Sequence, residues 1–188
     1  MYKHYFNVKI GLMAITWKID PAHSEIQFKV KHLMITTVTG YFRKFDCEVT
    51  TETDDFNSTR DVRFTADINS IDTNNEQRDT HLKSADFFDA ANNQQVIFTG
   101  TRYETLGSEA TLQGNLTIRG ITKPIFLNVD FGGTVVDPAG QKKAGFTITG
   151  KISRKEFALM WNAVTEAGSV VVSDEVRINA DVQLIKQA

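Results

Sequence analysis

The chain has 188 residues, 41% of them hydrophobic, and a formal net charge of -2. This length suits one β domain with a sizeable core, and the interspersed charges include no basic tract of the kind that binds nucleic acid. No apolar run reaches the roughly 18 residues that a membrane-spanning helix needs. The single cysteine, Cys47, excludes a disulfide within the chain and is compatible with a reducing compartment.

The first 14 residues, MYKHYFNVKIGLMA, are ambiguous. Lys3 near the start and Ala14 at the end are typical of a signal peptide, but Asn7 and Lys9 interrupt its apolar stretch. We therefore interpret residues 1–14 as an N-terminal extension or an atypical leader, and this favours a cytoplasmic protein. The absence of a linker predicts one domain over residues 15–188.

Most of the remaining sequence alternates between apolar and polar residues, the period of a strand with one buried face. The clearest example is residues 25–32, where Ile26, Phe28 and Val30 fall on one side and Lys29 and Lys31 on the other. Residues 33–39 are expected to be irregular or to form one helical turn, and residues 41–53 to form one strand, bulged because Phe42 and Phe45 are out of step. The other expected strands are residues 14–19, 60–69, 95–104, 109–119, 124–136, 143–153 and 175–186.

The period changes over residues 74–84, NNEQRDTHLKS, which predict a helix with Asp72, Thr73 or Asn74 as its N-cap. A short connector with Phe87 and Phe88 follows, and residues 155–161 predict another short helical or irregular crossing. About eight antiparallel strands in one all-β domain favour an up-and-down barrel, with the helix and the two phenylalanines as a lid at its mouth. The alternative is a two-sheet sandwich, whose interior would be filled by side chains.

Five segments stand in the order and spacing of a known family: WKIDPAHSEIQFKVKH, GYFRKF, RDTHLKSADFF, LTIRGITKPIFL and GFTITGKISRKEF. From Trp17 to Leu184 the chain resembles the YceI-like family. One local departure is Lys155-Glu156-Phe157-Ala158, where the family usually has Asp-Phe-Gly. The resemblance implies a lipocalin-like antiparallel barrel that binds a polyisoprenoid or a similar long amphiphile in its tunnel. It also implies a periplasmic or secreted protein, in contrast to the leader.

The expected lipid site is the inward face of the strands together with the two lid phenylalanines. Its residues are Ile26, Phe28, Val30, Phe64, Ile68, Phe98, Leu116, Ile118, Leu127, Phe146, Ile148, Phe87 and Phe88. Small residues on the same faces, Gly100, Gly114 and Gly150 among them, would either widen the tunnel or mark barrel corners. The candidates for binding a polar head group are His32, Arg78 and His81, because such a group needs donors at the mouth.

No catalytic motif or metal-ligand spacing is found in the sequence, so we expect a non-enzymatic protein without a resident cofactor, although a bound isoprenoid or acyl lipid would fit. The expected partner is a hydrophobic small molecule, and a homodimer through the outer barrel face is a further expectation. Two alternatives stay open from the residues. One is a small-molecule enzyme in which His32, Arg78 and His81 converge, and the other is an interaction module with a solid barrel.

Overall fold

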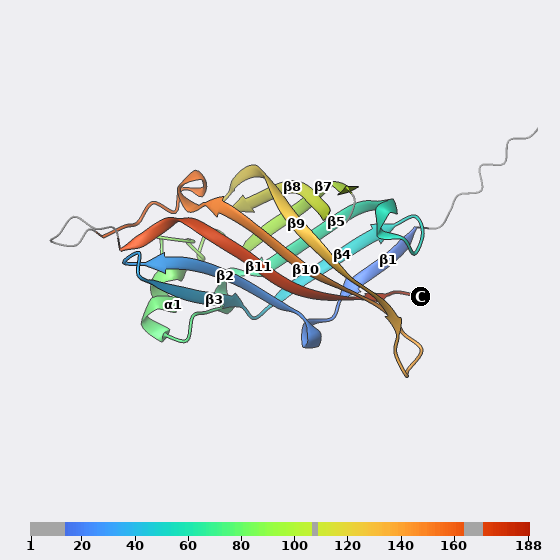
Figure 1. The fold of residues 1–188 in the computed structure, drawn as a ribbon. Helices are drawn as coiled ribbons and strands as arrows, with labels where there is room; N and C mark the ends of the chain where they lie inside the picture. Colours follow the sequence, from blue (N-terminus) through green and yellow to red (C-terminus); the bar gives the residue numbers. More distant parts are fainter. Residues whose placement is uncertain (1–13, 107–108, 164–170) are drawn as a thin grey trace, which may run out of the picture.

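The computed structural model describes residues 14–106, 109–163 and 171–188, which form a closed antiparallel β-barrel (Figure 1). Three of its eight strands are each broken into two segments. They are β1 (Ile15–Ile19) with β2 (Glu25–His32), β3 (Thr36–Phe42) with β4 (Phe45–Thr51), and β5 (Thr59–Asp67) with β6 (Ile71–Asp72). The unbroken strands are β7 (Gln95–Leu106), β8 (Glu109–Ile118), β9 (Ile121–Val136), β10 (Lys142–Ser153) and β11 (Val172–Lys186).

The barrel closes because β11 pairs with both halves of the first strand. Its first part pairs with β2, where Ile178 lies opposite Phe28, and its last residues pair with β1, where Leu184 lies opposite Ile19. The other strands pair with their neighbours in chain order, so the up-and-down topology is confirmed and the two-sheet sandwich was wrong.

Two of the strands are interrupted where an aspartate carboxylate, instead of a neighbouring strand, accepts a hydrogen bond from a backbone N–H. The third is interrupted where the chain bends. The carboxylate of Asp20 accepts a hydrogen bond from the Ala22 N–H and begins the 3-10 helix η1 (Pro21–His23) between β1 and β2. Asp67 accepts one from the Asn69 N–H in the same way and begins η3 (Ile68–Ser70) between β5 and β6. Two more 3-10 helices are η2 (Phe56–Ser58) and η4 (Arg154–Phe157).

The predicted helix is present as α1 (Glu76–Lys83), and Asn75 is its N-cap, with a side chain that accepts a hydrogen bond from the Arg78 N–H at 2.9 Å. Each of the three predicted N-cap candidates precedes the true cap. Among the described residues β6 pairs only with β3, so no ladder joins it to β7. The helix α1 lies at one end of the barrel (Figure 1), which we call the lid end.

Two strand predictions around residue 40 were wrong. Residues 36–39 are not irregular but begin β3, which forms a hairpin with β2 through a turn at Leu33–Ile35. Residues 41–53 are not one strand, because the chain bends at Arg43 and Lys44 between β3 and β4. The out-of-step Phe42 and Phe45 mark this bend, where the strand moves from pairing with β6 to pairing with β5.

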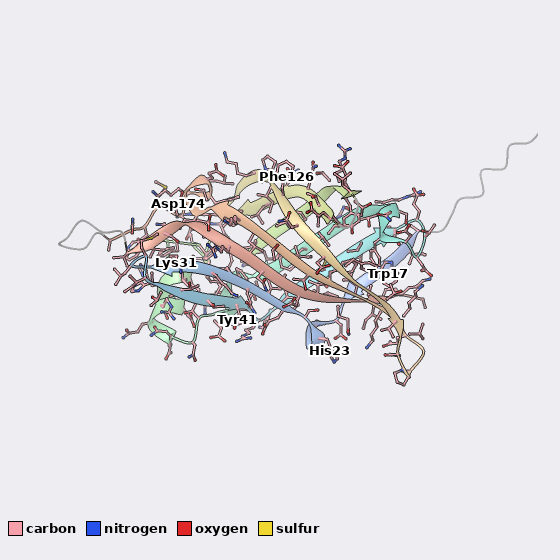
Figure 2. The ribbon with its side chains drawn as sticks, viewed as in Figure 1. Trp17, His23, Lys31, Tyr41, Phe126 and Asp174 are labelled. Atoms are coloured by element: carbon pink, nitrogen blue, oxygen red, sulfur yellow. The ribbon has the colours of Figure 1, made fainter. Side chains whose placement is uncertain are left out.

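At the other end of the barrel, which we call the plug end, aromatic rings pack together. The Trp17 ring centroid lies 4.8 Å from that of Phe56, which lies 4.8 Å from that of Phe146 and 5.8 Å from that of Phe131. Trp17 is fully buried and its indole N–H donates to the hydroxyl of Thr51 at 3.0 Å. Figure 2 shows Trp17 at this end, with Lys31 and Asp174 at the opposite one.

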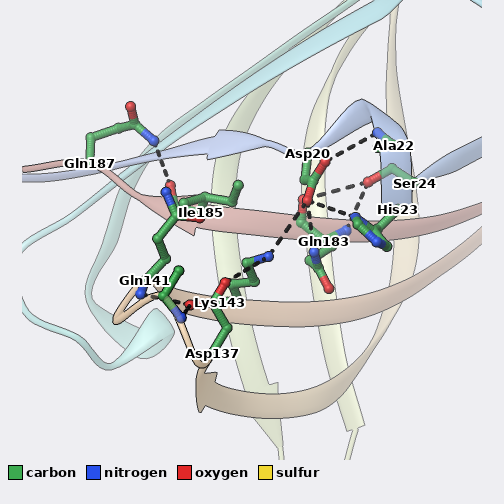
Figure 3. A network of polar contacts seen from close by, with 11 residues as sticks. Asp20, Ala22, His23, Ser24, Asp137, Gln141, Lys143, Gln183, Ile185 and Gln187 are labelled. Carbon is green, nitrogen blue, oxygen red and sulfur yellow. Dashed lines mark hydrogen bonds and ion pairs between the residues drawn. The ribbon is translucent and has the colours of Figure 1, made fainter.

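A polar network at the β1–β2 break joins that corner to the neighbouring strands (Figure 3). The Asp20 carboxylate accepts hydrogen bonds from the Gln183 amide at 2.9 Å and contacts the His23 ring at 2.9 Å. Lys143 lies 3.9 Å from it and 3.1 Å from the carboxylate of Asp137. The network therefore connects β1, β10 and β11 where the barrel closes.

The interpretation of the leader concerns residues that, apart from Ala14, lie outside the described part of the chain. Within the described part of the chain, no helix has the length and apolar character needed to cross a membrane.

Candidate functional site

The barrel encloses an elongated cavity of about 570 Å³. Its lining includes residues from Val172 to Leu184 of β11, which at about 3.3 Å per residue cover roughly 40 Å along the strand. With the usual strand tilt of a barrel, this length corresponds to roughly 30 Å along the axis. A solid barrel was therefore wrong as an alternative, and the space has the shape of a tube.

The alternating pattern located the lining well. All the predicted lipid-site residues line the cavity except Ile68. Ile68 is fully buried in η3, where the turn that Asp67 begins interrupts the alternation and directs Ile68 into the packed core. The lining also includes residues that the pattern did not identify, among them Phe56, Leu82, Tyr103 and Trp161.

The small residues on the inner wall accommodate large side chains from the paired strands. A Cβ added at Gly40 would lie 2.2 Å from the ring of Phe28, directly opposite in the ladder, and one at Gly114 would lie 2.3 Å from the ring of Phe98. At Gly150 it would lie 2.5 Å from Leu127. These glycines neither mark corners nor widen the tunnel by themselves. Instead, they let bulky side chains lie over neighbouring strands.

The charged residues that line the cavity all carry positive charge. The lining includes Lys31, Arg78 and Arg154, together with His32 and His81, and it includes no aspartate or glutamate among the described residues. These residues lie on β2, α1 and η4, elements that meet at the lid end. An apolar tube with a cationic end can hold an apolar chain and place an anionic or strongly polar group beside the donors.

The three predicted head-group residues all line the cavity, but each has a different environment. The Arg78 guanidinium donates to the hydroxyl and to the carbonyl of Thr73, each at 2.7 Å. His81 lies 3.1 Å from the Asp86 carboxylate and packs edge-on against Phe87 and Trp161. Arg78 and His81 are thus held in place by the lid itself.

Arg154 is a further cation of the lining, which sequence reasoning did not identify. Only 2% of its surface is exposed, and its guanidinium donates to the carbonyl oxygens of Leu159, Trp161, Val172 and Ser173. Burial lowers its pKa, and Asp174 partly offsets the effect. One feature of the sequence could have indicated Arg154. It follows Ser153 at the end of a strand and lies within the motif that matches the family. Arg154 fixes the segments on either side of the mouth.

The geometry also bears on chemistry in the cavity. No hydrogen bond joins His32, Arg78 and His81 to one another in the described ranges. Cys47 lines the cavity too, but burial and then the neighbouring Asp46 and Glu48 raise the pKa of its thiol to about 12. Such a thiol stays protonated at neutral pH and is a poor nucleophile.

The comparisons with known proteins agree with this architecture. A family model described as the YceI-like domain matches residues 17–184. The chain belongs to the YceI-like family. It is 38% identical over 178 residues to protein YceI of Salmonella newport, covering 93% of this chain and 89% of that protein.

Solved structures of other proteins show the same fold. The YceI protein of Campylobacter jejuni has a TM-score of 0.71 and 26% identity, with all of both chains covered. A polyisoprenoid binding domain from Saccharophagus degradans has a TM-score of 0.63 and 15% identity, covering 91% of this chain and 98% of that one. The lipocalin-like barrel expected from the sequence motifs is therefore confirmed.

Proposed function

We propose that this protein binds a long amphiphilic lipid, such as a polyisoprenoid, an isoprenoid quinone or a fatty acyl chain, with its tail inside the barrel. The observation that carries the proposal is the apolar tube of about 570 Å³ with cationic side chains at one end. Membership in the YceI-like family and the polyisoprenoid binding domain among the structural neighbours support it.

The driving force for the tail is the removal of apolar surface from water. At roughly 25 cal/mol per Å², a chain of several isoprene units gains on the order of 10 kcal/mol before ordering costs are subtracted. Phe28, Phe98 and Leu127 lie over glycines, which keeps their bulk against the wall and leaves the axis for a chain.

The head group would lie at the lid end, close to His32, Arg78 and His81. Arg78 is already oriented by Thr73, so little side-chain entropy is lost when it binds an anion. His32 lines the cavity at the end of β2, and His81 extends the donor set from α1. A carboxylate, a phosphate or a quinone oxygen would each find donors there.

The role that follows is carriage, storage or sequestration rather than catalysis. A carrier needs shape, an apolar lining and a mouth, and it needs no activated nucleophile. The protonated Cys47 and the separate hydrogen-bond partners of Arg78 and His81 favour this role over the alternative of an enzyme.

The direct test compares two adjacent residues of β2. Phe28→Asp places a carboxylate in the lumen, whereas Lys29→Asp places the same group at a position that does not line the cavity. We expect native mass spectrometry and organic extraction to find lipid bound to the wild type and to Lys29→Asp. Phe28→Asp should lose it, because an unpaired charge in an apolar site costs several kcal/mol.

A second variant keeps the test valid if Phe28→Asp fails to fold. Ile148→Trp adds bulk to the lining without a charge, and its effect on lipid content should follow the volume that it removes. Thermal unfolding shows whether each variant is folded. Wild-type lipid content in folded Phe28→Asp and Ile148→Trp would contradict a ligand in the lumen.

A further inference from the structure

Exposed apolar side chains gather around the mouth of the cavity. Met34 is 58% exposed and Ile35 is 77% exposed in the turn between β2 and β3, and Met160 is 60% exposed in the segment after η4. The Leu33 N–H donates to the carbonyl of Val171, which ties this turn to the residue directly before β11. A cluster of large exposed apolar residues indicates an interaction surface.

The turn has a backbone conformation that its residues do not favour. Leu33 and Met34 have φ angles of 50° and 60°, and the Ile35 N–H donates to the carbonyl of His32, so residues 32–35 form a turn with positive φ at both central positions within the three-residue connection. Such turns strongly prefer Asn-Gly, because side chains with a Cβ fit this region poorly. Leucine and methionine therefore do not serve the turn itself, and strain of this kind is typical of functional segments.

Three cations that form no ion pair with any described residue lie beside this apolar surface, although one of them, Lys155, helps to lower the pKa of the Asp174 carboxyl. Lys31 precedes the turn in β2, Arg78 lies on the lid and Lys155 lies in η4. None of the three forms an ion pair with a carboxylate in the described part of the chain. Ser173 joins these elements, because its hydroxyl accepts from the Lys31 N–H at 3.0 Å and its carbonyl accepts from Arg154 at 2.9 Å.

The plug end has a different distribution of charge. Its exposed apolar pair, Val135 and Val136, is followed by Asp137, and the nearby Lys142 and Lys186 both form ion pairs with Asp54. Around the cavity mouth, exposed apolar residues therefore lie beside cations that form no ion pair within the described residues, whereas beside Val135 and Val136 the nearby cations are paired. This combination is complementary to an anionic lipid bilayer, where apolar side chains enter the interface and cations contact the head groups.

We propose that the lid end docks on an anionic lipid membrane through Met34, Ile35 and Met160, with Lys31, Arg78 and Lys155 facing the head groups. This inference rests on the proposed function, because docking there places the cavity mouth against the bilayer from which a lipid enters or to which it returns. The partner is a lipid surface, and a protein partner is an outcome that the test distinguishes.

The test measures sedimentation of the protein with vesicles of phosphatidylcholine, with and without phosphatidylglycerol. Met34→Gly with Ile35→Gln removes the apolar tip, and it favours the turn because glycine accepts positive φ without strain. We expect the affinity of this variant for the vesicles to fall by roughly tenfold or more. Its thermal stability should be unchanged or higher. The matched control, Val135→Gln with Val136→Gln, removes an equally exposed apolar pair at the plug end and should bind vesicles like the wild type.

Lipid content separates this inference from the proposed function. The Met34→Gly, Ile35→Gln variant should still carry lipid after purification, because neither residue lines the cavity. If the wild type carries lipid but does not bind phosphatidylglycerol vesicles, or if the variant binds them as well as the wild type, docking by this end is wrong. Equal binding to phosphatidylcholine alone would overturn the role of the cations.

Discussion

The two ends of the barrel are stabilised in different ways. At the plug end, a neutral hydrogen bond between the fully buried Trp17 and Thr51 lies among packed aromatic rings. At the lid end, the buried cation Arg154 binds carbonyl oxygens of the segment after η4 and of the start of β11. One end therefore depends on the packing of aromatic rings, and the other on a charge that holds two backbone segments together. We infer from this comparison that stability is concentrated at the plug end and that, in the proposed function, the ligand enters at the lid end.

The largest effect is expected from truncation at the plug end. Trp17→Ala should lower the free energy of unfolding by about 4 kcal/mol, because it leaves a large cavity and removes the hydrogen bond to Thr51. Denaturant unfolding followed by circular dichroism measures this change. Trp161→Ala at the lid end is the matched variant, because Trp161 is only partly buried and contacts His81 and Phe87.

If the ends differ as we infer, Trp161→Ala should cost about 1–2 kcal/mol, less than Trp17→Ala, and should change lipid retention instead. Equal losses of stability in the two variants would remove the distinction between a structural end and an access end.

A smaller effect is expected in the wall between the ends. Gly40→Ala should force the Phe28 ring away from the wall, because the new Cβ would lie 2.2 Å from it. A ring displaced from the wall would occupy part of the cavity that Phe28 lines, so we expect weaker lipid binding together with a stability loss of about 1 kcal/mol. Gly145→Ala is the control, since nothing lies within 4 Å of its added Cβ.

Lipid content after purification and titration with a fluorescent fatty acid measure the binding of both variants. Adding Phe28→Leu to Gly40→Ala should restore binding, because the smaller side chain removes the overlap. A Gly40→Ala protein that binds lipid like Gly145→Ala would show that the ring position does not control the space in the tube.

The wall of the barrel was more predictable from the sequence than its ends. Alternation alone placed Phe28, Phe98 and Leu127 on the cavity, because a strand has only two faces. It failed for Ile68, where an aspartate-initiated turn replaces the strand period. Such turns depend on side-chain hydrogen bonds that the period does not record.

The sequence predicted some of the residues that lie at the lid end, but not how the segments there pack against one another. Arg78 and His81 share a helix and were identified together, whereas Arg154 reaches the mouth only through the folding of η4 onto the segments around Trp161 and Val172. Hydrogen bonds from one side chain to carbonyl oxygens 7 and 18 residues further along the chain leave no periodic pattern in the sequence. The family motif marked Arg154 without indicating that it would bind carbonyl oxygens.

The smallest expected effect tests the corner where the first strand breaks near the closure of the barrel. Burial raises the pKa of Asp20, but hydrogen bonds from His23, Ala22 and Gln183 outweigh it, so the pKa of Asp20 lies below its usual value. A depressed folded-state pKa means that the carboxylate stabilises the fold above its unfolded pKa of about 3.9 and that this contribution is lost as the pH falls through the folded value.

Asp20→Asn should therefore be less stable than the wild type at neutral pH, and the difference should narrow below about pH 4. Thermal unfolding of both proteins across this pH range measures the change. Asp86→Asn is the corresponding variant at the lid end, where the exposed contact with His81 should contribute little to stability. A difference between Asp20→Asn and the wild type that does not depend on pH would mean that the side chain acts at this corner through its shape and not through its charge.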